Sequence, residues 1–149
     1  MLKSAFTKVY SKFKLHFYKE VLALFENREA GLTRVEVFCM DAIVALGRPT
    51  VNEFAAFMRI SSPNAAYKVN SLIRKGYVQK VQSESDRREF YLEVTEKYMT
   101  AYNSSLNYMN LVVERIGKRF SPEDCQKFAQ MLEIISGELM PEVENPKQA

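Results

Sequence analysis

The chain has 149 residues, 47% of them hydrophobic and 26% charged, with a net charge of +3. This size and composition predict one soluble globular domain that buries a core of its own. With only two cysteines, Cys39 and Cys125, a disulfide framework is excluded and a reducing, cytoplasmic setting is favoured. No apolar run is long enough to span a bilayer, and lysines interrupt the N-terminal segment where a signal peptide needs an apolar core.

Positive charge is concentrated in one segment of the chain. Residues 59–88 hold seven Lys/Arg and two Asp/Glu, a balance of +5, whereas residues 1–58 carry +2 and residues 89–149 carry −4. A local excess of this kind is typical of a surface that binds a polyanion.

The first half of the chain is predicted to be helical. Apolar side chains recur every three or four residues over residues 3–27, which predicts one long helix. Thr33 is a candidate N-cap for a helix over 34–46 that is apolar on nearly every side, so we expect it at the centre of the fold. Thr50 and Glu53 then form a capping-box pattern at the start of a short helix.

A helix-turn-helix followed by a hairpin is predicted next. Ser62 as N-cap and Pro63 at the first helical position open a further helix, and Gly76 ends it. Only about three residues separate this helix from the preceding one, which is typical of a helix-turn-helix. Two strand-like runs follow at 77–82 and 89–94, around a charged turn.

Two more helices are predicted after the hairpin. Thr95 precedes an apolar stripe over 96–119, and the Ser121-Pro122 pair opens a helix over 122–139. The tail at 141–149 is expected to be disordered.

The order of elements defines a mainly α fold with a small β-hairpin wing. We expect a single domain over 1–149, with a winged helix-turn-helix lobe at 33–95. The flanking helices within 3–27 and 96–140 carry apolar stripes that so small a lobe cannot cover. A symmetric dimer built from both chain ends would bury them, which makes these the predicted dimerisation helices.

The second helix of the pair, over 62–75, is the candidate DNA-recognition helix. Its polar face combines short polar, aromatic and basic groups that can reach base edges in a major groove. The alternative is that this is only the solvated face of an ordinary amphipathic helix. The helix-turn-helix spacing and the hairpin favour a DNA-binding face. The candidate contact residues on this helix are Ser62, Asn64, Ala65, Tyr67, Lys68, Ser71 and Lys75.

The turn of the hairpin supplies a second candidate DNA contact. An arginine at the tip of a narrow wing can enter a minor groove, and Arg88 is placed to do so. Asp86 would repel phosphate, so its expected role is to hold an arginine or a backbone amide and fix the shape of the wing. Lys80 and Arg87 are expected to meet phosphates. The alternative is a charged surface turn whose ion pairs contribute little.

Two stretches resemble the multiple antibiotic resistance regulator (MarR) family. "SDRREFYLEVTEK" at 85–97 is similar to the family's wing signature, and "SLIRKGYV" at 71–78 resembles the end of its recognition helix. The resemblance implies a dimeric winged-helix transcription regulator, usually a repressor, in which Arg88 enters the minor groove and Asp86 braces the wing. Tyr67 and Tyr98 depart from the family pattern; the first puts sequence preference in doubt, but not DNA binding.

The resemblance also implies an effector, since similar regulators often bind a small aromatic or lipophilic ligand that releases DNA. An aromatic cluster could line its cavity, although such a stripe is also typical of plain core. Thiol-based redox sensing is an alternative, with Cys39 expected to be inert packing and Cys125 near a helix N-terminus. No metal site and no cofactor are predicted. The candidate ligand-binding residues are Tyr10, Phe13, His16, Phe17 and Phe38.

Other classes of protein fit the sequence less well. A single histidine and the lack of a Gly-rich phosphate loop, metal-ligand spacing or nucleophile–base pair argue against an enzyme. A winged helix used only for protein–protein contact is the stronger rival, but it does not explain a basic wing tip. The partners expected are therefore double-stranded DNA with a near-palindromic operator, a second copy of the chain and a small effector.

Overall fold

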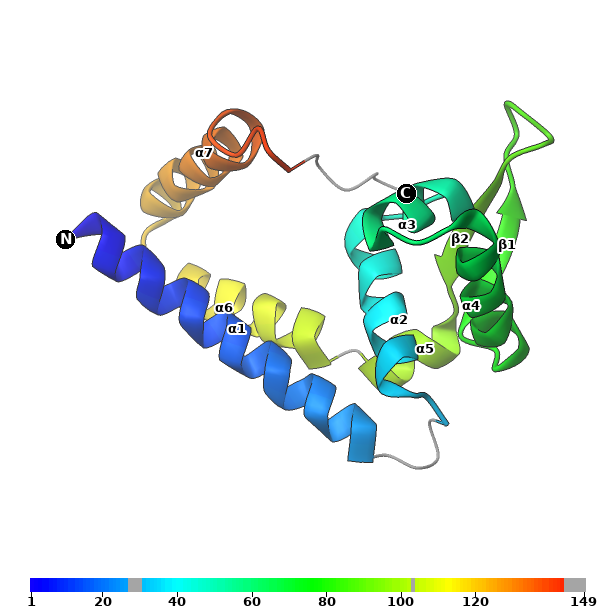
Figure 1. Cartoon of the computed structure of the whole chain (residues 1–149). Coiled ribbons are helices and arrows are strands. Elements are labelled where there is room, and N and C mark those ends of the chain that lie inside the picture. The colour runs from blue at the N-terminus through cyan, green and yellow to red at the C-terminus, as the bar shows by residue number, and fades with distance from the viewer. Residues whose placement is uncertain (27–30, 103, 144–149) are drawn as a thin grey trace.

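A computed structural model describes residues 1–26, 31–102 and 104–143 of the chain. These residues form seven helices and one two-stranded antiparallel sheet (Figure 1). No helix in the described part is long and apolar enough to cross a membrane. The elements, in chain order, are α1 (Leu2–Glu26), α2 (Arg34–Leu46), α3 (Val51–Met58), α4 (Ser62–Arg74), β1 (Val78–Gln82), β2 (Phe90–Val94), α5 (Glu96–Tyr102), α6 (Ser104–Arg119) and α7 (Pro122–Glu138).

The core lies in a lobe formed by α2, α3, α4, α5 and the hairpin. The expectation that the apolar helix over 34–46 lies at the centre is confirmed, because α2 contributes more buried residues than any other described element. Burial of these apolar side chains is the main stabilising term of the lobe. The buried hydrophobic residues are Val37, Cys39, Met40, Ala42, Ile43, Phe54, Ala55, Ala65, Val69, Leu72, Tyr77, Val78, Leu92 and Tyr98.

Helix starts in the lobe are set by capping side chains. The predicted capping box of Thr50 and Glu53 is present at α3, and Thr33 caps α2 as predicted. The predicted N-cap of α4 was one residue too late, since Ser61 Oγ accepts the backbone N–H of Asn64 at 3.3 Å. Ser62 is then the first helical residue, and the following proline remains in the first turn, where its missing N–H costs nothing.

The helix-turn-helix and the hairpin both form as predicted. Residues 59–61 join α3 to α4, with Arg59 in the left-handed region at φ 53°. The strands pair antiparallel, with Val78 opposite Val94 and Gln82 opposite Phe90. Each strand begins one residue later than the sequence pattern suggested, a difference within the usual fraying of element ends.

Three long helices, α1, α6 and α7, lie outside this lobe (Figure 1). Helix α1 crosses α6, and α7 follows the end of α6 that points away from the lobe. The single helix expected over 96–119 is instead two helices, α5 and α6, with residue 103 outside the described part. The expected tail at 141–149 is described only to residue 143.

Candidate nucleic-acid interface

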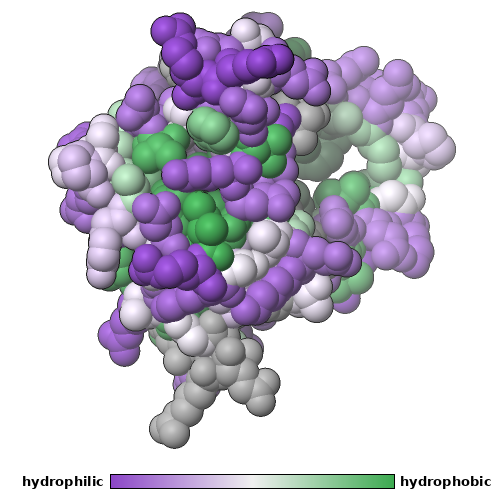
Figure 2. Space-filling view, turned by 90° about the vertical axis from the view of Figure 1, so that its right-hand side faces the viewer, coloured by the Kyte–Doolittle hydropathy of each residue, from purple (hydrophilic) through white to green (hydrophobic). Residues whose placement is uncertain are grey.

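Helix α4 presents one face to the core and one to solvent. Val69 and Leu72 are fully buried, whereas Tyr67 is 69% exposed. Ser62 and Asn64 are also exposed, and Lys68 is half-buried at the edge of this face. Seen from the wing side, hydrophilic residues cover most of the lobe and hydrophobic groups lie in small patches between them (Figure 2). The first two turns of α4 therefore offer the polar face that the sequence predicted.

One predicted contact residue lies in the core instead. Ala65 has no exposed surface, so its side chain cannot touch DNA. It precedes Val69 by four residues and Leu72 by seven, which places all three on one side of a helix. The periodicity of the sequence already contained this signal.

The last turn of α4 is turned toward α2 rather than toward solvent. Ser71 Oγ donates a hydrogen bond to Glu36 Oε1 at 2.8 Å, and Lys75 Nζ lies 2.7 Å from Glu36 Oε2. Lys75 Nζ also donates to the carbonyl oxygen of Gly31 at 2.7 Å. The predicted role of Ser71 and Lys75 as DNA contacts is thus at odds with their placement, since both side chains are engaged within the lobe.

Glu36 is the centre of that polar contact, a role that was not predicted from the sequence. Its side chain is only 11% exposed. Burial alone would raise its pKa, but the hydrogen bonds from Lys75, from the Thr33 amide and hydroxyl, and from Ser71 outweigh burial and lower the pKa from 4.5 to about 2. Glu36 is therefore a carboxylate at neutral pH.

The wing tip is organised by Asp86. Its carboxylate accepts the backbone N–H of Arg88 at 2.9 Å and two guanidinium N–H groups of the same residue at 3.1 Å. These bonds lower the pKa of Asp86, and they raise the pKa of Arg88. The predicted bracing role of Asp86 agrees with this geometry. The guanidinium is nevertheless 91% exposed, so it is available to a partner.

Further hydrogen bonds fix the backbone of the turn. Ser83 is buried, and its hydroxyl oxygen accepts the backbone N–H groups of Ser85 and Asp86 at 3.3 Å each. Gln82 Nε2 donates to the carbonyl oxygen of Arg87 at 2.7 Å. The side chains of Lys80 and Arg87 are exposed, as the sequence predicted.

The Thr-Glu-Lys stretch after the wing contacts the end of α4. Thr95 Oγ1 donates to the carbonyl oxygen of Gly76 at 2.6 Å. Lys97 Nζ donates to the carbonyl oxygen of Lys75 at 2.8 Å and lies 4.4 Å from the centre of the Tyr77 ring. Because helix C-termini expose unpaired carbonyls, a threonine and a lysine at this place connect the wing to the recognition helix. The motif is visible in the sequence, but these contacts with the end of α4 were not predicted from it.

The predicted effector residues lie in different surroundings. His16 stacks on Tyr108 at 3.9 Å between ring centres, and Phe13 meets the same ring edge-on at 5.7 Å. Tyr10 and Phe38 are 58% and 60% exposed, and Phe17 packs against the core of the lobe.

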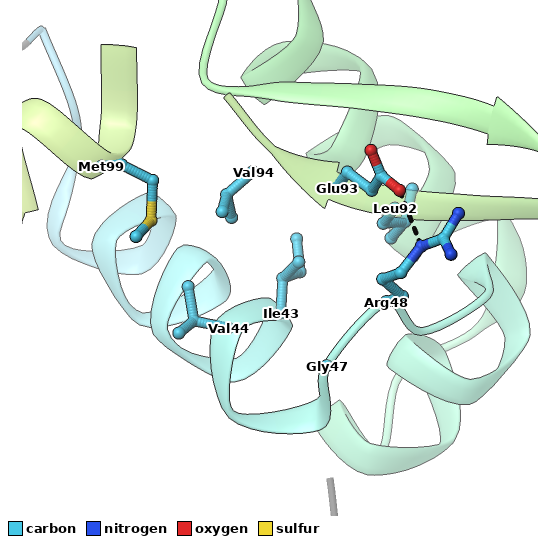
Figure 3. A pocket seen from close by; sticks show the side chains of 8 residues that line it. All are labelled: Ile43, Val44, Gly47, Arg48, Leu92, Glu93, Val94 and Met99. Atoms are coloured by element: carbon cyan, nitrogen blue, oxygen red, sulfur yellow. Dashed lines mark ion pairs between the residues drawn. The ribbon is translucent and has the colours of Figure 1, made fainter. Parts of the chain in front are cut away.

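A cavity of about 390 Å³ lies elsewhere, between the end of α2, β2 and α5 (Figure 3). Its walls are apolar except for an ion pair in which Arg48 Nε lies 2.6 Å from Glu93 Oε1. The lining residues are Ile43, Val44, Gly47, Arg48, Leu92, Glu93, Val94 and Met99.

The two thiols occupy different surroundings. Cys39 is fully buried, and burial raises its pKa, which disfavours the reactive thiolate. Cys125 is half-buried beside a second cavity of about 490 Å³ between α6 and α7, lined also by Ile116, Phe120, Asp124 and Phe128.

A two-helix recognition unit followed by a braced, basic hairpin defines a winged helix-turn-helix protein. A sequence model of the MarR family matches residues 30–89, which include the recognition helix and most of the wing. The chain is therefore similar to MarR family proteins over this segment, and its fold is a winged helix-turn-helix. A search of curated proteins finds no matching sequence.

Solved structures share the fold over nearly the whole chain. FabT of Streptococcus pneumoniae, solved in complex with DNA, is 22% identical with a TM-score of 0.56, covering 95% of this chain and 97% of its own. A MarR family protein from Bacillus stearothermophilus is 17% identical with a TM-score of 0.57, covering 93% and 92%. The transcriptional regulator Tm0710 of Thermotoga maritima is 17% identical with a TM-score of 0.54, covering 93% and 96%.

Proposed function

We propose that this protein is a MarR-type transcription regulator, a cytoplasmic homodimer that binds a near-palindromic site in double-stranded DNA and represses transcription. The observation that carries the proposal is the pairing of an exposed polar face on α4 with an exposed arginine at a braced wing tip. A solved structure of similar fold, FabT of Streptococcus pneumoniae, is a complex with DNA, which supports the same use of the fold here.

In the proposed complex the first turns of α4 lie in the major groove. Asn64, Tyr67 and Lys68 then face base edges, while Ser62 and the start of the helix hold a phosphate. The wing lies alongside, with Arg88 in the minor groove and Lys80 and Arg87 on phosphates. Ala65, Ser71 and Lys75 are left out of this contact set because of their placement in the lobe.

Exposed apolar surface on the outer helices supports the dimer. No residue of α7 is buried in the single chain, although Met131, Leu132 and Ile134 are apolar and 59%, 45% and 49% exposed. On α1, Phe6 and Val9 are 56% and 57% exposed. Extended apolar surfaces of this kind usually mark protein interfaces, and a two-fold axis would cover both copies at once.

The salt dependence of duplex binding tests the proposal. Affinity for duplex DNA should fall steeply with salt, with a log–log slope of about 0.9 per phosphate contact. The footprint on selected genomic fragments should be two-fold symmetric, with half-sites about one helical turn apart. A flat salt response, or no retardation of any duplex at low salt, would instead support a winged helix that serves protein–protein contact.

We further propose that a small aromatic or lipophilic effector releases DNA, and that its site is the cavity between α2, β2 and α5. That cavity has apolar walls and touches a wing strand, so an occupant can alter the position of the wing. Filling the cavity with Val44→Phe should abolish the response to an effector while leaving DNA binding intact. Unchanged effector sensitivity in this variant would place the site elsewhere.

A further inference from the structure

A buried carboxylate joins two parts of the chain that are distant in sequence, residues 31–36 and residues 71–75. Glu36 lies in the first turn of α2, and Oε2 accepts the backbone N–H of Thr33 at 2.8 Å. From α4, the Ser71 hydroxyl and the Lys75 ammonium reach the same carboxylate at 2.8 and 2.7 Å. Lys75 continues to the Gly31 carbonyl oxygen, in the segment just before α2. We call this set of contacts the Glu36 cluster.

Among the ion pairs of the described part, Glu36 is the most buried side chain, since the glutamates of the His16–Glu20 and Arg48–Glu93 pairs are 30% and 28% exposed. Glu36 and Lys75 side chains are 11% and 34% exposed, whereas the Lys118–Glu114 and Lys127–Glu123 pairs of α6 and α7 are each more than half exposed. Buried charges are costly unless they are paired and hydrogen-bonded, and removing one partner leaves the other uncompensated. The paired arrangement of Glu36 and Lys75 is therefore strongly preferred over arrangements that leave either charge buried without its partner.

The cluster acts on the recognition helix at one end. Ser71 and Lys75 are four residues apart, so both point from the last turns of α4 toward the start of α2. The opposite end of α4 is the one proposed to meet bases. Because a helix is a stiff rod, a tilt at its last turn displaces its first turn, and base contacts tolerate little displacement.

We propose that Glu36 is a positioning residue for DNA recognition, which fixes the tilt of α4 relative to α2 and to the chain segment at Gly31. This inference rests on the proposed function, and it assigns no DNA contact to Glu36 itself. It also gives Lys75 a role inside the lobe in place of the DNA contact expected from the sequence.

The decisive variant is Glu36→Gln. Glutamine keeps the size of the side chain and can still complete the capping box at Thr33, so the change removes mainly the charge facing Ser71 and Lys75. Glu114→Gln is the matched control, because it alters net charge equally in an exposed ion pair of α6. Ser71→Ala is a second variant, which removes one bond of the cluster while alanine favours the helix.

Duplex binding well below the melting temperature is the first measurement. Glu36→Gln should lower affinity roughly tenfold, with Ser71→Ala between it and wild type, the control unchanged and the salt slope the same throughout. Added positive charge would on its own strengthen DNA binding, so a loss is diagnostic of misplacement. Wild-type affinity in Glu36→Gln would overturn the proposal. Tighter binding with a steeper salt slope would also overturn it, and would make Lys75 a phosphate contact restrained by Glu36.

Amide hydrogen exchange separates this proposal from the proposed function. Amides of residues 72–76 should exchange faster in Glu36→Gln than in the Glu114→Gln control, whether or not DNA is present. Unchanged exchange there would overturn the positioning role. If the wild-type chain retards no duplex while exchange still responds, the proposed DNA function fails and the restraint on α4 stands.

Discussion

Asp86 and Arg88 form a closed unit at the tip of the wing. The aspartate holds the backbone amide and the guanidinium of Arg88 at once, at 2.9 and 3.1 Å. The arginine remains 91% exposed, so the pairing orients the side chain without hiding it. This arrangement presents a cation in a fixed direction, which suits insertion into a narrow minor groove.

The first prediction concerns Arg88. Arg88→Ala should weaken binding to the operator about 10- to 100-fold, because an arginine in a groove contributes on the order of 1–3 kcal/mol. The melting temperature should hardly change, since the side chain is exposed. Titration of labelled operator DNA measures the affinity, and a thermal melt measures the melting temperature. Arg87→Ala is the comparison, with a smaller loss and a salt slope lower by about 0.9. Normal binding by Arg88→Ala would show that the wing is not the minor-groove contact.

The second prediction concerns Asp86. Asp86→Ala should reduce operator affinity by roughly threefold to tenfold even though it removes a negative charge beside DNA, because Arg88 loses its anchor. Asp86→Asn should lose less, since its amide oxygen can still accept the Arg88 N–H. Glu84→Gln removes the same charge from an exposed position of the wing and should leave affinity equal or slightly higher. If Asp86→Ala behaved like Glu84→Gln, Asp86 would be only a repulsive charge.

The third prediction concerns acid stability. The pKa of Glu36 is lowered from 4.5 to about 2 in the folded chain, so the unfolded chain binds a proton first as the pH falls. The contribution of Glu36 is complete above pH 4.5 and is lost as the pH falls toward 2, amounting to about 3 kcal/mol. Urea unfolding at pH 6, 4 and 3 should show a smaller acid-induced loss for Glu36→Gln than for wild type. Parallel pH profiles for the two proteins would contradict the lowered pKa.

The fourth prediction concerns the dimer. Leu132→Asp places a charge on the exposed apolar face of α7 and should convert the proposed dimer to a monomer of 17.2 kDa, with a helical circular-dichroism spectrum retained. Phe57→Asp, at an exposed apolar residue of α3, should leave the protein with the mass of a dimer in solution. Sedimentation velocity distinguishes the two species. A dimer that persists in Leu132→Asp would move the interface away from α7.

Much of the fold could be predicted from local chemistry. The caps at Thr33 and Thr50, the short turn between α3 and α4, and the hairpin all follow from side chains that bond their own backbone neighbours or alternate along a strand. The pairing of Asp86 with Arg88 is local in the same way, because the two residues are only two positions apart in the chain. Such contacts depend on sequence spacing, and spacing is visible in a sequence.

Contacts between distant segments were decided by the tertiary structure alone. Glu36 meets Ser71 across 35 residues, and no spacing rule connects the two. For the same reason Ser71 and Lys75, which share a polar face in a helical projection, turned out to face α2 rather than solvent. A helical pattern tells which residues share a face, but the packing of neighbouring helices decides what that face meets. The sequence by itself determined the elements and the wing, and the docking of α2 on α4 decided which polar residues of α4 stay exposed to solvent.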